Sequence, residues 1–199
     1  NYQLTQNNTC TITITRATHT VTFRQQGQED KVFSVLDLAD FTEPIPQVVP
    51  VTGYTVVWEA KDLTRVTEDI VVNAIITPVE YRITYVLDGG TNPDEAPDSY
   101  TIESATFTLP TPTKYGYTFD GWYTDSKFTN KTEQITNGSI GDVTLYAKWT
   151  VVTYSLTLKD LDGGTLKGDL PSQFTINDLP LTLPRCYKKD YTFEGWELD

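Results

Sequence analysis

The sequence predicts a mainly β protein made of small repeated modules, and three observations indicate this. Apolar and polar residues alternate with a period of two over several segments, which is typical of strands with one buried face. Two stretches of the chain, residues 88–122 and 162–196, align without a gap. No segment sustains the i, i+3, i+4, i+7 apolar spacing of an amphipathic helix.

The clearest alternation lies at the two ends of the middle repeat. Its opening segment, 81–87, and its closing segment, 143–149, each place every second residue on one apolar face. The side chains expected to point inward are Tyr81, Ile83, Tyr85, Leu87, Val143, Leu145, Ala147 and Trp149. On the closing strand, Thr144, Tyr146 and Lys148 are then expected on the opposite face.

Turn residues separate these strands. Asp88-Gly89-Gly90 and Asp162-Gly163-Gly164 supply the positive φ angles that tight turns need. Gly53, Gly116 and Asp190 each precede a Tyr-Thr pair at equivalent places in the repeats. We expect all three in the left-handed region, which glycine enters freely and aspartate tolerates better than most residues.

Other segments connect the strands. Residues 33–41 are the best candidate for one or two helical turns, because Val35-Leu36-Asp37-Leu38-Ala39 is followed by Asp40. Pro110 and Pro112 mark extended crossovers, since proline cannot donate to a sheet ladder.

The repeats divide the chain into four parts. Tyr117–Trp122 matches Tyr191–Trp196, and a divergent earlier copy has Gly53-Tyr54-Thr55 with Trp58 one residue closer than in the middle copy. We predict the closing strand of a preceding module over 1–18, modules over 19–80 and 81–153, and a truncated module over 154–199. Because both ends fall inside a repeat, the segment is expected to come from a longer array.

The joins between modules predict an elongated array. Residues 77–80 and 150–153 are four-residue joins without glycine, so a closing strand runs almost directly into the next opening strand. Small-angle scattering is expected to give a maximum dimension well above that of a compact sphere of the same mass. A globular scattering profile would contradict this expectation.

The truncated module has no counterpart to Val143–Trp149 and is expected to expose a sheet edge, which favours pairing with another chain. Cys10–Ile14 has the composition of such a closing strand. One interpretation is that this strand completes the third module of a neighbouring molecule, which predicts weak head-to-tail self-association. The other is that it packs beside the first module and the third stays open.

Composition excludes several function classes. With 27 acidic and 15 basic residues the net charge is −12, which disfavours nucleic-acid binding because that needs clustered Lys and Arg. No apolar run is long enough to insert into a membrane. No metal-ligand spacing or phosphate-binding loop occurs, so we expect neither metal nor cofactor. Asp160-Leu161-Asp162-Gly163 lacks the later carboxylates of a calcium loop.

Catalysis is not expected either. His19, the single histidine, stands where the other copies have Tyr81 and Tyr154, so it is interpreted as a ring at the edge of the core. The four tryptophans could stack on sugars, but their recurrence at fixed positions favours core anchors. Tyr123 and Tyr146 fall on the outward parity and are the candidate ligand or surface contacts, although they could simply be amphipathic strand residues.

The motif Gly116–Tyr123, followed by Asp142–Trp149, resembles the Listeria–Bacteroides repeat, also called the internalin B-repeat type module. The opening 81–90 fits the same pattern, 154–199 fits it in part, and 19–77 fits it weakly. The resemblance implies compact β-grasp (ubiquitin-like) modules in tandem on extracellular bacterial proteins, either surface-anchored or secreted. It implies no catalytic residues.

The resemblance also suggests a role. Such arrays serve as adhesin stalks and interaction segments, so the partner is expected to be a surface protein or glycan of a host or neighbouring cell. The alternative from another class is a glycan-binding accessory module of a larger secreted enzyme. Exposed aromatic rings sharing one plane in a groove would favour this alternative.

Overall fold

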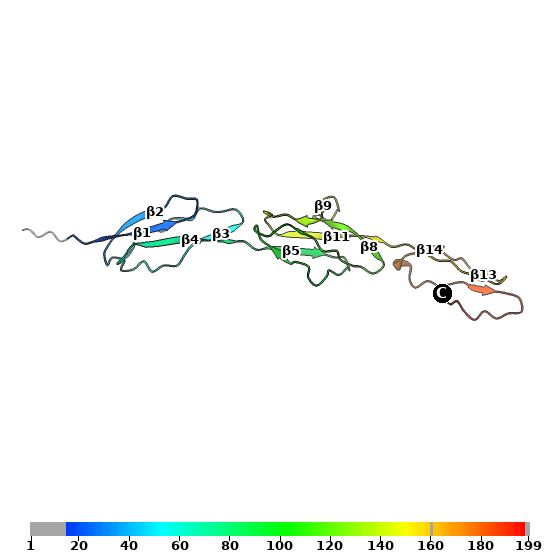
Figure 1. The fold of residues 1–199 in the computed structure, drawn as a ribbon. Coiled ribbons are helices and arrows are strands. Elements are labelled where there is room, and N and C mark those ends of the chain that lie inside the picture. The colour runs from blue at the N-terminus through cyan, green and yellow to red at the C-terminus, as the bar shows by residue number, and fades with distance from the viewer. Residues whose placement is uncertain (1–14, 160, 198–199) are drawn as a thin grey trace, which may run out of the picture. The chain divides into compact units, whose positions relative to one another are not determined.

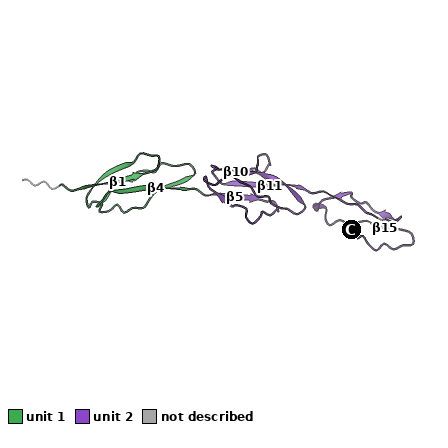
Figure 2. Cartoon of the chain, viewed as in Figure 1, with its two compact units in different colours: residues 1–79 green, residues 80–199 purple. Residues whose placement is uncertain are grey.

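The computed structural model describes residues 15–159 and 161–197, and this part of the chain forms strands, turns and one short 3-10 helix (Figure 1). The expected mainly β class is confirmed. The chain divides into two compact units, residues 1–79 and 80–199 (Figure 2). The expected closing strand Cys10–Ile14 lies outside the described residues.

Unit 1 contains one sheet in the order β2-β1-β4-β3. Its strands are β1 (Thr18–Arg24), β2 (Lys31–Leu36), β3 (Tyr54–Trp58) and β4 (Ile70–Pro78). The central pair, β1 and β4, is parallel, and each edge strand is antiparallel to its neighbour. The opening and closing strands of this unit therefore lie side by side, although they are far apart in the sequence.

The core of unit 1 is centred on Phe23, which is fully buried. Its ring lies 5.2 Å from that of Trp58 and 5.8 Å from that of Phe41, measured between centroids. The contact with Trp58 is edge-to-face, whereas the Phe41 ring is tilted at 48°. An edge-to-face pair stabilises the fold beyond the apolar area that it buries. The helical turns expected within 33–41 are wrong, because Phe33 and Val35 alternate inward on β2 and pair with β1.

The same unit holds one long loop by a buried amide. Gln25 is only 4% exposed, and its side chain donates to the Val49 carbonyl at 2.7 Å and accepts from the Val49 N–H at 2.8 Å. A glutamine side chain can bond in both directions at once, as a backbone amide does. It therefore stands in for a strand partner at Val49.

Replacing Gln25 with Ala is expected to lower the free energy of unfolding of unit 1 by about 1–3 kcal/mol, because both polar groups of Val49 lose their partner. Urea unfolding followed at the Trp58 indole would measure the change. Gln28→Ala, at an exposed position, is the control and should be nearly neutral. Equal effects of the two substitutions would contradict this account.

Unit 2 begins with a five-stranded sheet in the order β6-β5-β11-β8-β9, beside which β7 pairs with β10. The strands are β5 (Tyr81–Val86), β6 (Ser99–Tyr100), β7 (Phe107–Thr108), β8 (Tyr117–Tyr123), β9 (Lys131–Thr132), β10 (Gln134–Ile135) and β11 (Val143–Val151). Again the opening strand β5 and the closing strand β11 form a central parallel pair. The register is also equivalent, since Ile83 lies opposite Val143 as Val21 lies opposite Ile70.

The inward faces of β5 and β11 are as the alternation predicted. The buried cluster and the side chains packed against it include Tyr81, Ile83, Tyr85, Leu87, Val143, Leu145, Ala147 and Trp149. Trp122, from β8, is only 2% exposed at the centre of this cluster. The interpretation of Trp122 as a core anchor is therefore confirmed.

The core residue Tyr85 has a pKa well above the usual value of a tyrosine. Its hydroxyl donates to the Pro97 carbonyl at 2.9 Å. Burial, reinforced by the negative charge of Asp98, raises the pKa of Tyr85 to about 12. The folded chain thus keeps this proton at a pH where the unfolded chain has lost it.

Between about pH 10 and pH 12, the stability of this sheet is expected to fall as pH rises, because only the unfolded chain releases the Tyr85 proton. Tyr85→Phe has no proton to release and should show a shallower loss over the same range. Urea unfolding at several alkaline pH values would compare the two chains. Parallel pH profiles would contradict the assignment to Tyr85.

The remainder of unit 2 has short paired segments only. These are β12 (Tyr154–Ser155) with β14 (Gln173–Phe174), β13 (Thr165–Lys167) with β15 (Arg185–Tyr187), and the 3-10 helix η1 (Ile176–Asp178). Apart from Pro184, no described residue in 152–197 is buried. This segment therefore lacks the filled core of the sheet that precedes it.

Two local features recur through the chain. Gly53, Gly116 and Asp190 have φ angles of 80°, 76° and 66°, which confirms the left-handed turn expected before each Tyr-Thr pair. Each following tryptophan donates its indole N–H to the carbonyl of a proline twelve residues earlier. The pairs are Trp58 with Pro46, Trp122 with Pro110 and Trp196 with Pro184.

A bulge distinguishes β8 from its counterpart β3. Phe119 and Trp122 are three residues apart, yet both rings point into the core and lie 5.4 Å from each other. The pairing of β8 with β11 shifts between Lys148 and Trp149, and Gly121 has a φ of 140°. The pairing of β3 with β4 shows no shift, which accounts for the shorter interval between Gly53 and Trp58.

Candidate functional site

The outer face of the β5–β11 sheet carries both sequence-predicted contact residues. Tyr123 of β8 and Tyr146 of β11 lie directly opposite each other in the antiparallel register. Both are half-buried and on the face away from Trp122 and Leu145. The structure therefore brings together two residues that the sequence placed only by their parity.

Two further side chains complete this group, which we call the aromatic patch: Tyr123, Phe128, Tyr146 and Lys148. The Phe128 ring lies 5.4 Å from the Tyr123 ring at an interplanar angle of 83°. The Lys148 ammonium lies 5.4 Å from the Tyr123 centroid and 6.0 Å from that of Phe128. At these distances a cation is attracted to the face of each ring.

The turn after β8 positions Phe128. Asp125 accepts hydrogen bonds from the backbone N–H groups of Lys127, Thr129 and Asn130, at 3.0, 3.1 and 2.8 Å. Burial raises the pKa of Asp125, but these hydrogen bonds outweigh it and leave the pKa below its usual value. Phe128 itself has a φ of 58°, held by this turn. Sequence periodicity could not find Phe128, because it belongs to a loop.

The rings of the patch do not share a plane, since Tyr123 and Phe128 meet nearly at right angles. A flat sugar-stacking surface needs ring faces turned the same way, so this geometry is a poor match to one. Exposed aromatic side chains are instead typical of protein contacts, where Tyr and Phe are enriched.

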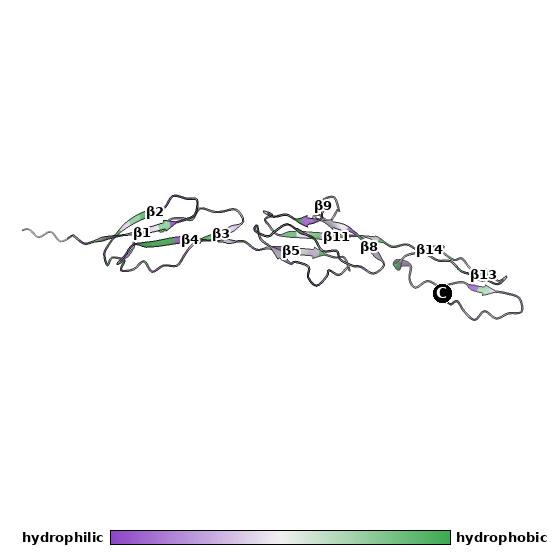
Figure 3. Cartoon of the chain, viewed as in Figure 1, coloured by the Kyte–Doolittle hydropathy of each residue, from purple (hydrophilic) through white to green (hydrophobic). Residues whose placement is uncertain are grey.

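Unit 1 presents a different outer face. Val32, Val57, Val71 and Ile75 are exposed there, and β4 is one of the strongly hydrophobic strands in Figure 3. None of these side chains is aromatic or charged. Of the two described sheets that have filled cores, only the sheet of unit 2 therefore carries an aromatic patch.

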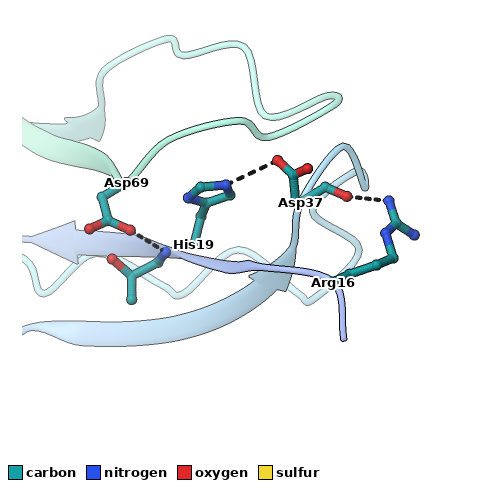
Figure 4. A network of polar contacts seen from close by, with 5 residues as sticks. Arg16, His19, Asp37 and Asp69 are labelled. Carbon is teal, nitrogen blue, oxygen red and sulfur yellow. Dashed lines mark hydrogen bonds and ion pairs between the residues drawn. The ribbon is translucent and has the colours of Figure 1, made fainter. Parts of the chain in front are cut away.

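The polar network around His19 has a structural role (Figure 4). The His19 imidazole contacts the Asp37 carboxylate at 3.1 Å, and the Arg16 guanidinium donates to the Asp37 backbone carbonyl. On the other side of β1, Asp69 accepts from the Thr20 N–H at 2.7 Å. These contacts hold β1 to the segments on either side of it.

The Asp69 contact recurs in unit 2, where Asp142 accepts from the Arg82 N–H at 2.8 Å. The hydrogen bonds from Thr20 lower the pKa of Asp69. In both units, a carboxylate just before the closing strand caps the opening strand. The acidic residues at these positions are therefore explained by strand pairing rather than by acid–base chemistry.

Within residues 15–159 and 161–197, no group of three His, Cys, Asp or Glu side chains is arranged to hold a metal ion. In the same residues, no helix has the length and apolar character needed to cross a membrane. Two sheets with central parallel strands, repeated indole anchors and one exposed aromatic patch define a repeat-type β segment.

Comparison with known proteins identifies the family that the middle repeat resembles. Residues 81–148 match the model of the Listeria-Bacteroides repeat domain, which confirms the family resemblance of the middle repeat. The matched range coincides with the sheet that bears the aromatic patch. No solved structure gives a significant match to this chain.

Three relatives extend the comparison. A putative Gly-rich membrane protein of Evansella cellulosilytica is 30% identical over 138 residues, covering 69% of this chain and 15% of that protein. A putative membrane protein of the same organism is 29% identical over 149 residues, covering 73% and 22%. Internalin H of Listeria monocytogenes is 39% identical over 87 residues, covering 43% and 15%. The chain thus spans less than a quarter of each of these proteins.

Proposed function

We propose that this chain is a non-catalytic repeat segment of an extracellular bacterial protein, acting as an adhesin stalk and interaction module. The observation that carries the proposal is the Listeria-Bacteroides repeat at 81–148. The names of the relatives, two membrane proteins and an internalin, support a place at the cell surface.

The proposal includes the domain organisation. Modules over 19–80, 81–153 and 154–199 follow one another in tandem, each based on a β-grasp-like sheet. The central parallel pair of opening and closing strands in both filled sheets supports this assignment. So does the indole anchor, which is present in all three.

The aromatic patch is proposed as the contact surface, with a surface protein of a host or neighbouring cell as its partner. Phe128 is exposed and the two tyrosines are half-buried on a sheet face that the core does not need, and Lys148 adds a cation beside them. A partner carrying acidic and apolar groups would match both features. Since the chain has a net charge of −12, Lys148 would also give an acidic partner a local site of favourable charge.

Binding of the chain to cell-surface extracts and to a glycan array would test this. The double variant Tyr123→Ser/Tyr146→Ser should lose binding, whereas Tyr115→Ser should keep it. Tyr115 is a matched control because it is 84% exposed in the same unit but outside the patch. Equal binding by both variants would contradict a role for the patch.

The second candidate, a glycan-binding accessory module of a larger secreted enzyme, is favoured only by the exposure of the aromatic rings. Glycan-array binding that is lost in the double variant would establish it over the first. Binding only to protein in the extract, removed by protease treatment of the extract, would support the first.

A further inference from the structure

The edge strand β2 of unit 1 is open on its outer side (Figure 1). Within the described part of the chain it pairs with β1 alone, and this pairing runs over six residues without a bulge. The strand that lies beside the opening strand of unit 2, β6, has only two residues and comes shortly after Pro97. Short strands, bulges and prolines protect sheet edges from pairing with other chains, and β2 has none of these features.

The even-numbered residues of β2 direct their backbone N–H and C=O groups to this open side. The Asp37 N–H, just after the strand, donates to the Ala17 carbonyl of the β1 side at 2.8 Å. Bonded and non-bonded pairs alternate in an antiparallel ladder, so the odd-numbered residues of β2 bond to β1 and the even-numbered ones face away. In agreement, the N–H of Thr20, which lies opposite Ser34, donates to a carboxylate beside β4 instead.

The sequence of β2 is complementary to itself when two copies run antiparallel about Ser34. The facing residues, each pair formed twice, are then Lys31 with Asp37, Val32 with Leu36, and Phe33 with Val35. Apolar pairs and opposite charges directly across an antiparallel ladder stabilise it. Val32 and Leu36 are 59% and 48% exposed in the single chain, and in this register each would cover the other.

The charged ends of β2 identify the occupant of the edge as a second copy. Lys31 is exposed, and the Asp37 side chain is 36% exposed although it contacts the His19 imidazole at 3.1 Å. Both side chains belong to odd-numbered positions, so they lie on the same face of the sheet. Two copies would place one Lys31–Asp37 pair at each end of the joined strands, which gives local attraction between chains that each carry a net charge of −12.

We propose that β2 of unit 1 is the docking edge for a second copy of this chain, with the two β2 strands antiparallel about Ser34. The same strand serves both copies, so the association closes at two. Main-chain hydrogen bonds at Val32, Ser34 and Leu36 provide the affinity, and the two Lys31–Asp37 pairs fix the register. This inference concerns unit 1 and is independent of the aromatic patch and of the partner proposed for it.

Sedimentation velocity of the 199-residue chain, over about 1 µM to 1 mM and with a thiol reductant, should show a monomer–dimer equilibrium. Lys31→Asp places like charges opposite each other twice in the dimer and should raise the Kd about tenfold or more. Lys61→Asp makes the same change of net charge at an exposed position outside β2 and should leave the Kd unchanged. A monomer at all concentrations, or equal Kd values for the two variants, would overturn the proposal.

Exchanging the two charges separates pairing from a defect in folding. Asp37→Lys alone should weaken the dimer as Lys31→Asp does. The double variant Lys31→Asp/Asp37→Lys again has opposite charges across the axis and should recover most of the affinity. Fluorescence of Trp58, in the core of unit 1, reports that each variant is folded. A folded double variant that dimerises no better than the single variants would contradict the proposed register.

A cysteine on the two-fold axis tests the register directly. The Cα atoms of a hydrogen-bonded antiparallel pair lie about 5.5 Å apart, a distance that a disulfide spans. In a chain carrying Cys10→Ser and Cys186→Ser, Ser34→Cys should therefore form a covalent dimer on mild oxidation. Thr55→Cys, at an exposed position of the opposite edge strand β3, is the control and should remain monomeric. Crosslinking of both variants, or of neither, would overturn the proposal.

Discussion

Replacing Trp122 with alanine is expected to lower the free energy of unfolding of the β5–β11 sheet by about 3–5 kcal/mol. The side chain is 2% exposed, its ring contacts Tyr85 and Phe119, and its indole bonds to the Pro110 carbonyl. The substitution removes all of these contacts and leaves a cavity. Since small domains have about 5–15 kcal/mol of stability in total, a loss of this size approaches complete unfolding.

Hydrogen exchange gives a local measurement, because amides of β5 and β11 should lose protection while those of β1 and β4 keep theirs. Trp196→Ala is the matched control. It removes the same indole–proline hydrogen bond, but from a repeat in which Pro184 is the only buried residue within 152–159 and 161–197. Its effect should be much smaller. Similar losses from Trp122→Ala and Trp196→Ala would show that the hydrogen bond, not the core, dominates.

Replacing Gly121 with valine is expected to lower the free energy of unfolding of the same sheet by about 1–3 kcal/mol, because the backbone is strained and the bulge is lost. The φ of 140° at Gly121 suits glycine alone, and a β-branched residue would force the backbone to move. A Cβ at this position would also lie 2.4 Å from Lys131 Cε, although that side chain can swing away. Either Phe119 or Trp122 must then leave the core.

Deleting Gly121 should cost less than replacing it. Without this residue, Phe119, Asp120 and Trp122 follow one another directly, so their side chains point inward, outward and inward in turn. Val56, Val57 and Trp58 already do so in unit 1. The deletion thus converts the bulged strand to the regular form that the chain already contains. Chemical unfolding of both variants would compare them, and a deletion more harmful than Gly121→Val would contradict this interpretation.

Local chemistry explains why much of the fold is predictable. The inward sets of β5 and β11 follow from strict alternation, because successive side chains of a strand must point to opposite faces. The left-handed turns at Gly53, Gly116 and Asp190 follow from the few residue types that accept positive φ. Both signals are contained within a few residues of sequence.

Where a structural feature depends on residues distant in the sequence, the prediction from sequence is wrong or incomplete. The segment 33–41 has a short apolar run that suits either a helix or a strand, and pairing with β1 decides for the strand. The sequence indicates Tyr123 and Tyr146 as surface residues by their parity alone. That they lie opposite each other, with Phe128 and Lys148 beside them, depends on the β8–β11 register and on the Asp125 turn.

By itself, the sequence determined the mainly β class, the inward and outward faces of the strands, the turn positions and the family resemblance of residues 81–148. These properties arise from local backbone preferences and from a period of two, which short stretches of chain contain in full. The tertiary structure alone decided the bulge at Gly121 and the composition of the aromatic patch. Each depends on which strand lies next to which, and pairing between segments some sixty residues apart is set by the collective packing of the core rather than by any one segment.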